Sequence, residues 1–437
     1  MREMKNSGIA WMGEIPREWY ISRIKYVADV DPSCDKTKID GDSLITYTPM
    51  ECIRRGNFVN KAAYLNSVSS SLTAYEEGDI VMAKVTPCFE NGNIAIMTGL
   101  HNGFGLGSSE LFVFRPRSIV TEYLFYWLQN YVFVQNAKAT MTGTGGLKRV
   151  SPVFIKNCSI HIPPKEEQNK LVAFLDSKCT LVDTLIQNVQ TQIEKLKAYK
   201  QSLITEVVTK GLDPTVPMKD SGVDWIGEIP EHWGTVKLQY CARIRSGITL
   251  GKRYSVGTET IERPYLRVAN VQSGGVVLDN VKTVEVSMAD DLQYRLSSGE
   301  VLMTEGGDRD KLGRGCVWQG QIEPCLHQNH IFALQPNDLL DSQFLAYMTA
   351  SNVGRVYFDI TAIKTTNLAC TNSSKILAFR FPLPDKGEQT ELIACLDKKC
   401  AQIDRLIAIK QAKIEKLEQY KRSLIYEYVT GKKEVRL

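Results

Sequence analysis

The 437-residue sequence lacks the features that mark membrane-spanning and exported proteins. No apolar run approaches the roughly 18 residues of a membrane-spanning helix, so we expect none. The opening residues, MREMKNSG, contain no apolar segment of a secretory signal, so nothing predicts export. The eleven cysteines form no C-x-x-C pair, which favours reduced, mostly buried thiols in a cytoplasmic protein.

Catalytic and cofactor-binding motifs are also absent from the sequence. GITLGKR (247–253) has the wrong spacing for a phosphate-binding loop, and no Ser or Thr follows its lysine. GFGLGSS (103–109) is glycine-rich, but a strand-like run follows it where a nucleotide-binding loop would open a helix. His327 and His330 would point to opposite faces of one strand, so we expect no zinc site. The sequence therefore predicts a non-catalytic binding protein without cofactor or metal.

The net charge is only +4, which neither requires nor excludes a nucleic-acid partner. Basic residues are nevertheless concentrated in two stretches. Six lie between Arg115 and Lys156 with a single acidic residue, and six lie between Arg243 and Arg267 with two. Two such stretches are expected of a protein with two phosphate contacts, whereas solvated charged faces are the alternative interpretation.

Long segments of the sequence occur twice. Residues 5–28 and 219–242 share 11 identities in 24 positions, and both contain the phrase GEIPxxW. Residues 162–209 and 383–430 share 26 identities in 48 positions without a gap, at an offset of 221. Between them the same offset relates GDIVMAK to GEVLMTE. The repeats indicate a tandem duplication of a domain with its connector, which can pack as a pseudo-two-fold pair.

The second pair of repeats predicts two long amphipathic helices. Residues 165–210 and 388–430 contain neither Gly nor Pro, and a Gly follows each of them. Apolar residues recur at helical spacing over about 30 residues, which span roughly 45 Å as a helix. Such a stripe needs a partner, and the obvious partner is its own duplicate in a coiled coil. Lys410 and Lys421 interrupt the second stripe, at a cost in stability that can fix the register.

The repeated opening phrase places two tryptophans around a Gly–Pro turn in each copy. Because proline restricts the preceding residue to an extended conformation, the turn holds both rings in fixed positions. The rings can anchor the turn on a neighbouring helix of the same chain, or they can dock another subunit. The candidate docking residues are Trp11, Trp19, Trp225 and Trp233.

The variable blocks, roughly 20–160 and 235–382, indicate compact α+β domains, because short apolar runs alternate with Gly, Asn and Ser clusters. The offset of 221 continues inside them, where it relates Leu147 to Leu368. Each block contains Gly-rich basic loops, which suit contacts with phosphates and guanine, although ordinary surface turns are the alternative. The loops are 83–93, 142–150, 245–254 and 304–315. The candidate residues for such phosphate and guanine contacts are Lys84, Thr86, Lys148, Arg149, Lys252, Arg253, Arg309, Lys311 and Lys364.

Together these segments resemble the specificity subunit of type I DNA restriction–modification enzymes. The resemblance rests on GEIPREW and GEIPEHW, on GDIVMAK, on IPPKEEQNKLVAFLD with LPDKGEQTELIACLD, and on the tails IEKLKAYKQSLITEVVTKG and IEKLEQYKRSLIYEYVTGK. It covers essentially the whole chain. The second block has TEGGDRDKLGRG where the first has KVTPCFENG, as expected if the two halves bind different DNA.

The resemblance implies an α+β protein in which two tandem-duplicated target recognition domains are joined by two long helices, paired as an antiparallel coiled coil. Each domain would read one half of a gapped site in double-stranded DNA. The conserved segments would dock two adenine methyltransferase subunits, which associate with translocating nuclease subunits. The implied domains are a first target recognition domain (1–162), a first helical region (163–212), a second target recognition domain (213–383) and a second helical region (384–437).

Two alternative functions compete with this interpretation. A self-sufficient DNA methyltransferase would need an Asn/Asp-Pro-Pro-aromatic motif and a cofactor loop, and the sequence contains neither. A coiled-coil scaffold that carries two protein-binding or sugar-binding domains would show no salt-sensitive affinity for DNA. The sequence favours the non-catalytic specificity subunit over both.

Overall fold

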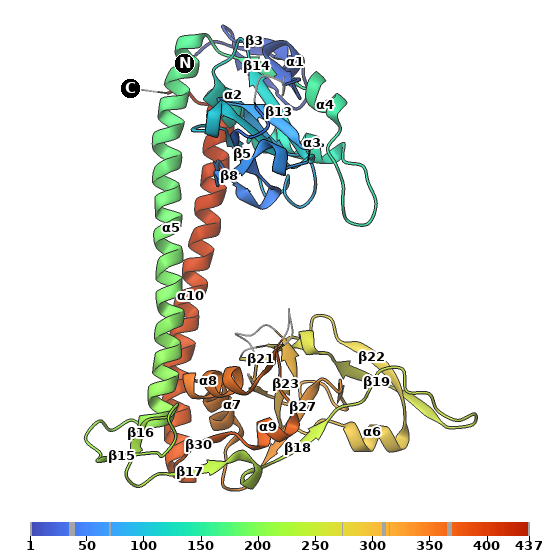
Figure 1. Ribbon diagram of the computed structural model, residues 1–437, viewed down its shortest axis with the longest axis vertical. Coiled ribbons are helices and arrows are strands. Elements are labelled where there is room, and N and C mark those ends of the chain that lie inside the picture. Colours follow the sequence, from blue (N-terminus) through green and yellow to red (C-terminus); the bar gives the residue numbers. More distant parts are fainter. Residues whose placement is uncertain are drawn as a thin grey trace. The chain divides into compact units, whose positions relative to one another are not determined.

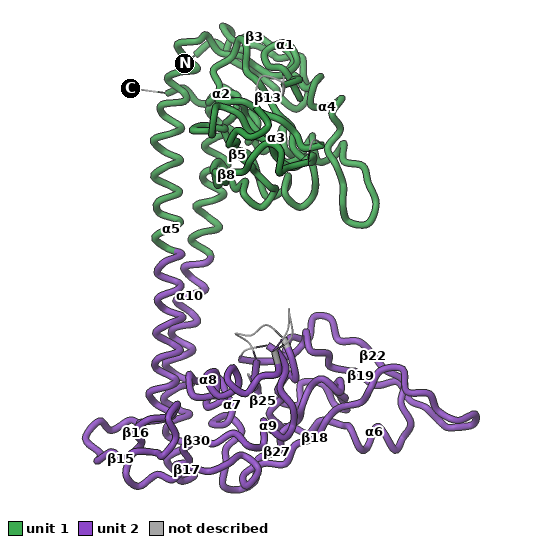
Figure 2. Tube along the Cα trace, in the orientation of Figure 1, with its two compact units in different colours: residues 1–189, 412–437 green, residues 190–411 purple. Residues whose placement is uncertain are grey.

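The computed structural model describes residues 2–34, 40–69, 71–272, 274–307, 312–313, 315–364 and 369–435. The chain forms two compact units, and one of them combines segments from both ends of the sequence (Figure 2). Unit 1 comprises residues 1–189 and 412–437, and unit 2 comprises residues 190–411. Each unit therefore contains one variable block and part of both long helices.

The long helices α5 (Lys165–Lys210) and α10 (Lys386–Val429) carry the conserved repeats (Figure 1). They contain 46 and 44 residues, so both extend beyond the apolar stripe of about 30 residues from which their length was predicted. The helices are longer because buried apolar residues such as Leu171 continue the stripe into the first turns. Gly211 and Gly431 follow them with φ of 77° and 69°, the left-handed conformation of a glycine cap.

The two helices pack against each other in opposite directions. In unit 1, Leu171 near the start of α5 shares a buried cluster with Leu424 near the end of α10. In unit 2, Leu203 near the end of α5 shares a buried cluster with Leu392 near the start of α10. The predicted antiparallel coiled coil is therefore confirmed in each unit.

The same ion pair joins the helices in both units. Lys421 Nζ lies 2.7 Å from Asp183 Oδ2 in unit 1, and Lys200 Nζ lies 2.6 Å from Asp404 Oδ2 in unit 2. The two lysines and the two aspartates are each related by the offset of 221. A lysine that interrupts the apolar stripe is thus paired across the seam, and the same pairing occurs in each unit, as the duplication of the sequence predicts.

Unit 1 contains two four-stranded sheets, in the orders β11-β10-β13-β4 and β8-β5-β12-β9. The first is antiparallel, and in the second β5 and β12 run parallel. The strands are β4 (Ala28–Val30), β5 (Leu44–Thr48), β8 (Lys61–Tyr64), β9 (Thr73–Glu76), β10 (Ile80–Ala83), β11 (Ile94–Ile96), β12 (Phe104–Gly107) and β13 (Leu111–Pro116). The shorter elements are α1 (Ile24–Val27), α2 (Thr121–Trp127), α3 (Tyr131–Ala139), α4 (Pro152–Asn157), β3 (Tyr20–Arg23), β6 (Ile53–Arg54), β7 (Asn57–Phe58) and β14 (Ser159–Ile162).

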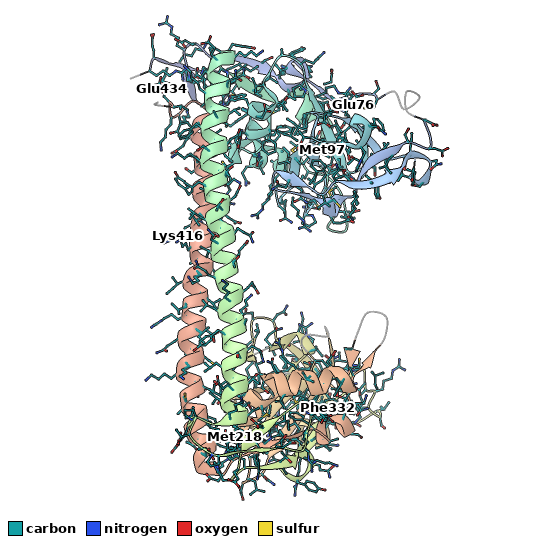
Figure 3. The ribbon with its side chains drawn as sticks, turned by 60° about the vertical axis from the view of Figure 1, so that its left-hand side comes forward. Glu76, Met97, Met218, Phe332, Lys416 and Glu434 are labelled. Carbon is teal, nitrogen blue, oxygen red and sulfur yellow. The ribbon has the colours of Figure 1, made fainter. Side chains whose placement is uncertain are left out.

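Unit 2 repeats the first order as β25-β23-β27-β18, and its three-stranded sheet β22-β19-β26, with β19 and β26 parallel, matches the strands β8-β5-β12 of the second. The strands are β18 (Ala242–Ser246), β19 (Thr260–Leu266), β22 (Lys282–Ser287), β23 (Val301–Thr304), β25 (Gly315–Val317), β26 (Leu326–His327) and β27 (Ile331–Pro336). The shorter elements are α6 (Met288–Tyr294), α7 (Ser342–Ala350), α8 (Asn352–Thr361), α9 (Ser373–Leu377), β17 (Gly234–Lys237), β20 (Val271–Gln272), β21 (Gly275–Val276) and β30 (Arg380–Leu383). Both units combine helices and strands, as predicted for α+β domains. Each unit also has its own buried clusters, which include Met97 in unit 1 and Phe332 in unit 2 (Figure 3).

Two sequence interpretations are revised by these strands. His327 ends β26 and His330 precedes β27, so the two histidines do not share one strand as predicted. Burial lowers the pKa of His327 to about 4, which keeps its ring neutral. The glycine-rich segment 103–109 contains β12, and a side chain at Gly105 would overlap the ring of Tyr75. Close packing accounts for that glycine.

The repeated opening phrase forms a small hairpin in each unit, β1 (Met4–Asn6) with β2 (Glu14–Pro16) and β15 (Met218–Asp220) with β16 (Glu228–Pro230). Trp19 Nε1 donates to Glu167 Oε2 in the first turn of α5, at 3.0 Å. Trp233 Nε1 donates to Glu388 Oε2 in the first turn of α10, at 2.8 Å. The glycine that caps the opposite helix lies against each indole ring. Each copy of the phrase therefore joins the start of one long helix to the end of the other.

Candidate nucleic-acid interface

A glycine-rich hairpin at residues 141–150 extends from unit 1 between α3 and α4 (Figure 1), and we call it the tip hairpin. The backbones of Thr142 and Arg149 pair across it, with N–H···O distances of 3.1 and 2.8 Å. Gly145 and Gly146 turn the chain with φ of 63° and 84°, as a two-residue type I′ turn requires. The predicted loop 142–150 is therefore an ordered hairpin with a defined turn.

The hydroxyl of Thr86 joins the tip hairpin to the first predicted loop. Thr86 Oγ1 donates to Gly146 O at 2.8 Å and accepts from the Lys148 N–H at 2.9 Å. The Thr86 N–H also donates to Lys148 O, at 2.9 Å. The loops 83–93 and 142–150 thus form one structure, in which Thr86 positions the backbone of the hairpin.

The three candidate cations of unit 1 have different surroundings. Lys148 is exposed and has no acidic partner in the described part of the chain. Arg149 donates to both carboxylate oxygens of Glu110, at 2.8 and 2.7 Å, and these hydrogen bonds lower the pKa of Glu110. The Lys84 ammonium lies 3.8 Å from Asp31, and only 20% of its side chain is exposed. Lys148 is therefore the most available of the three for a phosphate.

Unit 2 contains the same hairpin frame at the offset of 221. The frame is built from β24 (Gly306–Gly307), β28 (Ile363–Lys364) and β29 (Ala369–Cys370). Cys370 of β29 pairs with both other strands, as Arg149 pairs with the two corresponding residues of unit 1. The candidate Lys364 ends β28, and the tip at 365–368 lies outside the described residues.

A further segment of unit 2, before β19, contains the candidates Lys252 and Arg253. Lys252 Nζ donates to both oxygens of Asp290, at 2.7 Å each, and the Tyr254 hydroxyl donates to Asp290 Oδ2 at 2.6 Å. Burial favours a raised pKa for Asp290, but the hydrogen bonds from Lys252 and Tyr254 outweigh it and lower that pKa. Lys252 is held within the unit, whereas Arg253 is exposed without an acidic partner among the residues described.

The two basic stretches are less positive than their composition suggests. Seven of their cations form ion pairs with acids of their own unit: Arg115, Arg117, Lys138, Arg149, Arg245, Lys252 and Arg263. The candidates Arg309 and Lys311 lie outside the described residues. Sequence reasoning missed the acidic partners Glu110 and Asp290, because no local pattern relates them to the cations.

The four candidate docking tryptophans contact their own units. Trp19 and Trp233 are 0% and 1% exposed on the ends of the long helices. The Trp11 ring centre lies 6.5 Å from that of Trp127, and the half-buried Trp225 packs on Tyr357. These contacts anchor the opening phrase within the chain, and docking of another subunit by the same rings stays a prediction.

The described ranges contain no feature of a metal site or of a membrane span. No cluster of three or more His, Cys, Asp or Glu residues is placed there to hold a metal ion. No helix there is both long enough and apolar enough to cross a membrane. The features that point to function are therefore the two hairpin frames, their neighbouring cations and the coiled coil.

Comparison with known proteins shows that parts of the chain are similar to members of one family. Residues 16–195 match the family model of the type I restriction modification DNA specificity domain. The specificity subunit of the type I restriction enzyme EcoAI from Escherichia coli is 31% identical over 228 residues, which cover 51% of this chain and 37% of that protein. The MjaVIII specificity subunit of Methanocaldococcus jannaschii is 28% identical over 321 residues, which cover 71% of this chain and 69% of that protein.

The extent of these matches differs among the relatives. The alignments to the EcoAI subunit and the related EcoEI subunit cover only 37% and 33% of those proteins. A chain in a solved structure of a type I R-M system has a TM-score of 0.69 at 18% identity, covering 95% of this chain and 98% of that one. At this identity the likeness concerns the fold alone.

Proposed function

We propose that this chain, which belongs to the family of type I restriction–modification specificity subunits, binds double-stranded DNA at a gapped site made of two half-sequences. Unit 1 reads one half and unit 2 reads the other. Adenine methyltransferase subunits and translocating nuclease subunits, which assemble with the chain, then methylate or restrict the DNA. The chain works in the cytoplasm and contributes recognition without catalysis.

The observation that carries this proposal is a repeated frame with unlike tips. The segments 142–149 and 363–370 share their strand pairing where the structure describes both, but their sequences are TGTGGLKR and IKTTNLAC. A repeated frame positions two contacting elements alike, and different side chains on them give different base preferences. A scaffold that binds two copies of one protein partner would need similar side chains at the ends of both frames. The two sequences differ, so the DNA-reading function is favoured.

DNA binding by the purified chain tests this function. The target comes from methylome sequencing of cells that express the chain with its methyltransferase, and a scrambled duplex serves as the reference. We expect tighter binding to the target and a steep fall in affinity with salt. Replacing Lys148 by Ala should weaken binding to both duplexes and reduce the slope of log K against log salt by about 0.9, because one phosphate contact is lost.

Two controls accompany that measurement. Lys219 of β15 is an equally charged, exposed lysine outside both candidate loops, so Lys219→Ala should leave the slope unchanged. The chain alone should transfer no methyl group from S-adenosylmethionine to the target. Equal affinity for both duplexes with no salt dependence would support the scaffold function instead.

The coiled coil also carries an exposed apolar pair that occurs twice. Leu185 and Tyr420 in unit 1 are 38% and 53% exposed, and their equivalents Leu406 and Tyr199 in unit 2 are 47% and 58% exposed. Each residue directly precedes a seam position, so heptad geometry places both members of a pair on the same side of the coil. Two equal apolar faces suit two copies of one partner, and we assign them to the two methyltransferase subunits.

Replacing Leu185 and Tyr420 together by Ala should reduce the number of bound methyltransferase subunits from two to one. The remaining copy occupies the intact face of unit 2, and substitution of all four residues should abolish binding. Native mass spectrometry of the co-purified complex gives the stoichiometry. Gln192 and Lys413 occupy the same heptad position and are exposed, so their double Ala variant is the control and should keep both copies. Two copies on the four-residue variant would contradict the assignment.

A further inference from the structure

We propose that Leu147 inserts into the DNA as an apolar wedge, which partly separates two stacked bases in the half-site that unit 1 reads. This inference rests on the proposed DNA-binding function and specifies one of its contacts. Leu147 carries no charge, and the candidate cations Lys148 and Arg149 directly follow it in the tip hairpin.

Leu147 is an apolar side chain at the end of a polar hairpin. It is 55% exposed, and Gly145 and Gly146 before it contribute no side chain to the turn. The Leu147 N–H donates to Thr144 O at 3.2 Å, which closes the turn and places Leu147 as its last residue. Leu147 is therefore the apolar group that this narrow tip presents to a partner.

The backbone around Leu147 is fixed on both sides. The carbonyl before it, of Gly146, and the amide after it, of Lys148, both bond the hydroxyl of Thr86. At Gly143 a Cβ would lie 2.2 Å from the Leu147 carbonyl oxygen, so the opposite side of the hairpin closely approaches this residue. Because the backbone is already ordered, an insertion by Leu147 costs little further conformational entropy.

The charges beside Leu147 favour a nucleic acid over an apolar protein surface as the partner. Lys148 directly follows it, exposed and without an acidic partner among the described residues. An exposed cation adjacent to a fixed apolar side chain suits a duplex, in which the phosphates lie beside the stacked bases. Proteins that kink DNA insert leucine and similar residues between base steps in this way.

The duplication gives independent support from the sequence. The offset of 221 that relates the two hairpin frames also relates Leu147 to Leu368, although six of the eight residues in TGTGGLKR and IKTTNLAC differ. Leu368 lies outside the described residues, so the comparison concerns its sequence position alone. Both copies have a leucine at this position, although the residues beside it differ. This pattern suits a leucine whose contact is independent of the base sequence, and neighbouring residues that differ because they contact different bases.

Fluorescence of 2-aminopurine tests the wedge, because this base is quenched when stacked and brightens when a neighbour is separated from it. The full-length chain is titrated into target duplexes with 2-aminopurine at successive positions of the first half-site. We expect an increase at one base step. Leu147→Ala should abolish that increase and weaken binding about tenfold, since most of a buried leucine side chain is lost. Leu147→Met, which keeps an apolar side chain of similar size, should retain both effects.

Leu181 provides the matched control, because it is also a leucine of unit 1 with 55% exposure but lies on α5. Leu181→Ala should bind and brighten the duplex as the unsubstituted chain does. Specific binding with full brightening by Leu147→Ala would overturn the wedge while leaving the proposed function intact. Insertion would also be overturned if the unsubstituted chain bound the target without any fluorescence increase, even if Leu147→Ala bound it more weakly. Failure of the unsubstituted chain to prefer its target would instead refute the proposed function.

Discussion

Replacing residues 235–382 with the corresponding block of a relative will change one half of the methylated DNA sequence completely and leave the other half unchanged. The exchange is feasible because the same contact joins block and helix in both units. The Tyr347 hydroxyl donates to Asp397 of α10 at 2.5 Å, and the Tyr126 hydroxyl donates to Asp176 of α5 at 2.6 Å. Burial and the hydrogen bond to the aspartate raise the pKa of both tyrosines, so each hydroxyl stays protonated and remains a donor.

A donor block with a tyrosine at the position of Tyr347 should therefore dock on α10 without altering unit 1. Methylome sequencing of cells that express the chimera with its methyltransferase gives both half-sequences in one measurement. The reciprocal exchange of residues 20–160 is the matched control and should change the opposite half. If one exchange altered both halves, the two units would not read DNA independently.

Repeats and strong periodicities made the long elements predictable from the sequence. The helix α5 occupies the whole stretch without Gly and Pro from Lys165 to Lys210, and β5, β13 and β27 coincide with short apolar runs of the variable blocks, which read LITYT, ELFVFRP and HIFALQP. These signals are local, because hydrophobic period and backbone preference act over a few neighbouring residues. The predicted α+β class and the pairing of the two helices follow from the same signals once the duplication is recognised, whereas their antiparallel direction was implied by the resemblance to type I specificity subunits.

The surroundings of the candidate site residues were not predictable in this way. Lys252 bonds Asp290, 38 residues away, and Arg149 bonds Glu110, 39 residues away. A count of basic residues treats each cation as unpaired. In the folded unit, a carboxylate from a distant segment of the sequence pairs with the cation and neutralises it. The frame at 363–370 was also missed, because strands of two residues have no period. Its offset of 221 from the tip hairpin was the one signal that could have revealed it.

Inserting seven residues into each long helix will lengthen the gap between the two methylated half-sequences by about three base pairs. α5 and α10 each pass from one unit into the other, and Lys410 Nζ donates to Gln192 Oε1 at 2.6 Å, so these residues face each other. Duplicating residues 186–192 and 404–410 adds nearly two turns to each helix, which rotates the apolar stripe by only about 20°. The added length is roughly 10 Å, or about three base pairs at ~3.4 Å each.

The paired ion bridges explain why both helices must lengthen together. Lys421–Asp183 and Lys200–Asp404 lie on either side of the insertion points, so an insertion in α5 alone would displace one bridge and its neighbouring seam. We expect that variant to lose stability, seen as a lower melting temperature. Inserting two residues into each helix should be worse, because it rotates the stripe by about 200° and turns polar residues into the seam. Methylome sequencing reports the gap, and an unchanged gap in a folded, active seven-residue variant would show that DNA contacts, rather than the coil, set the spacing.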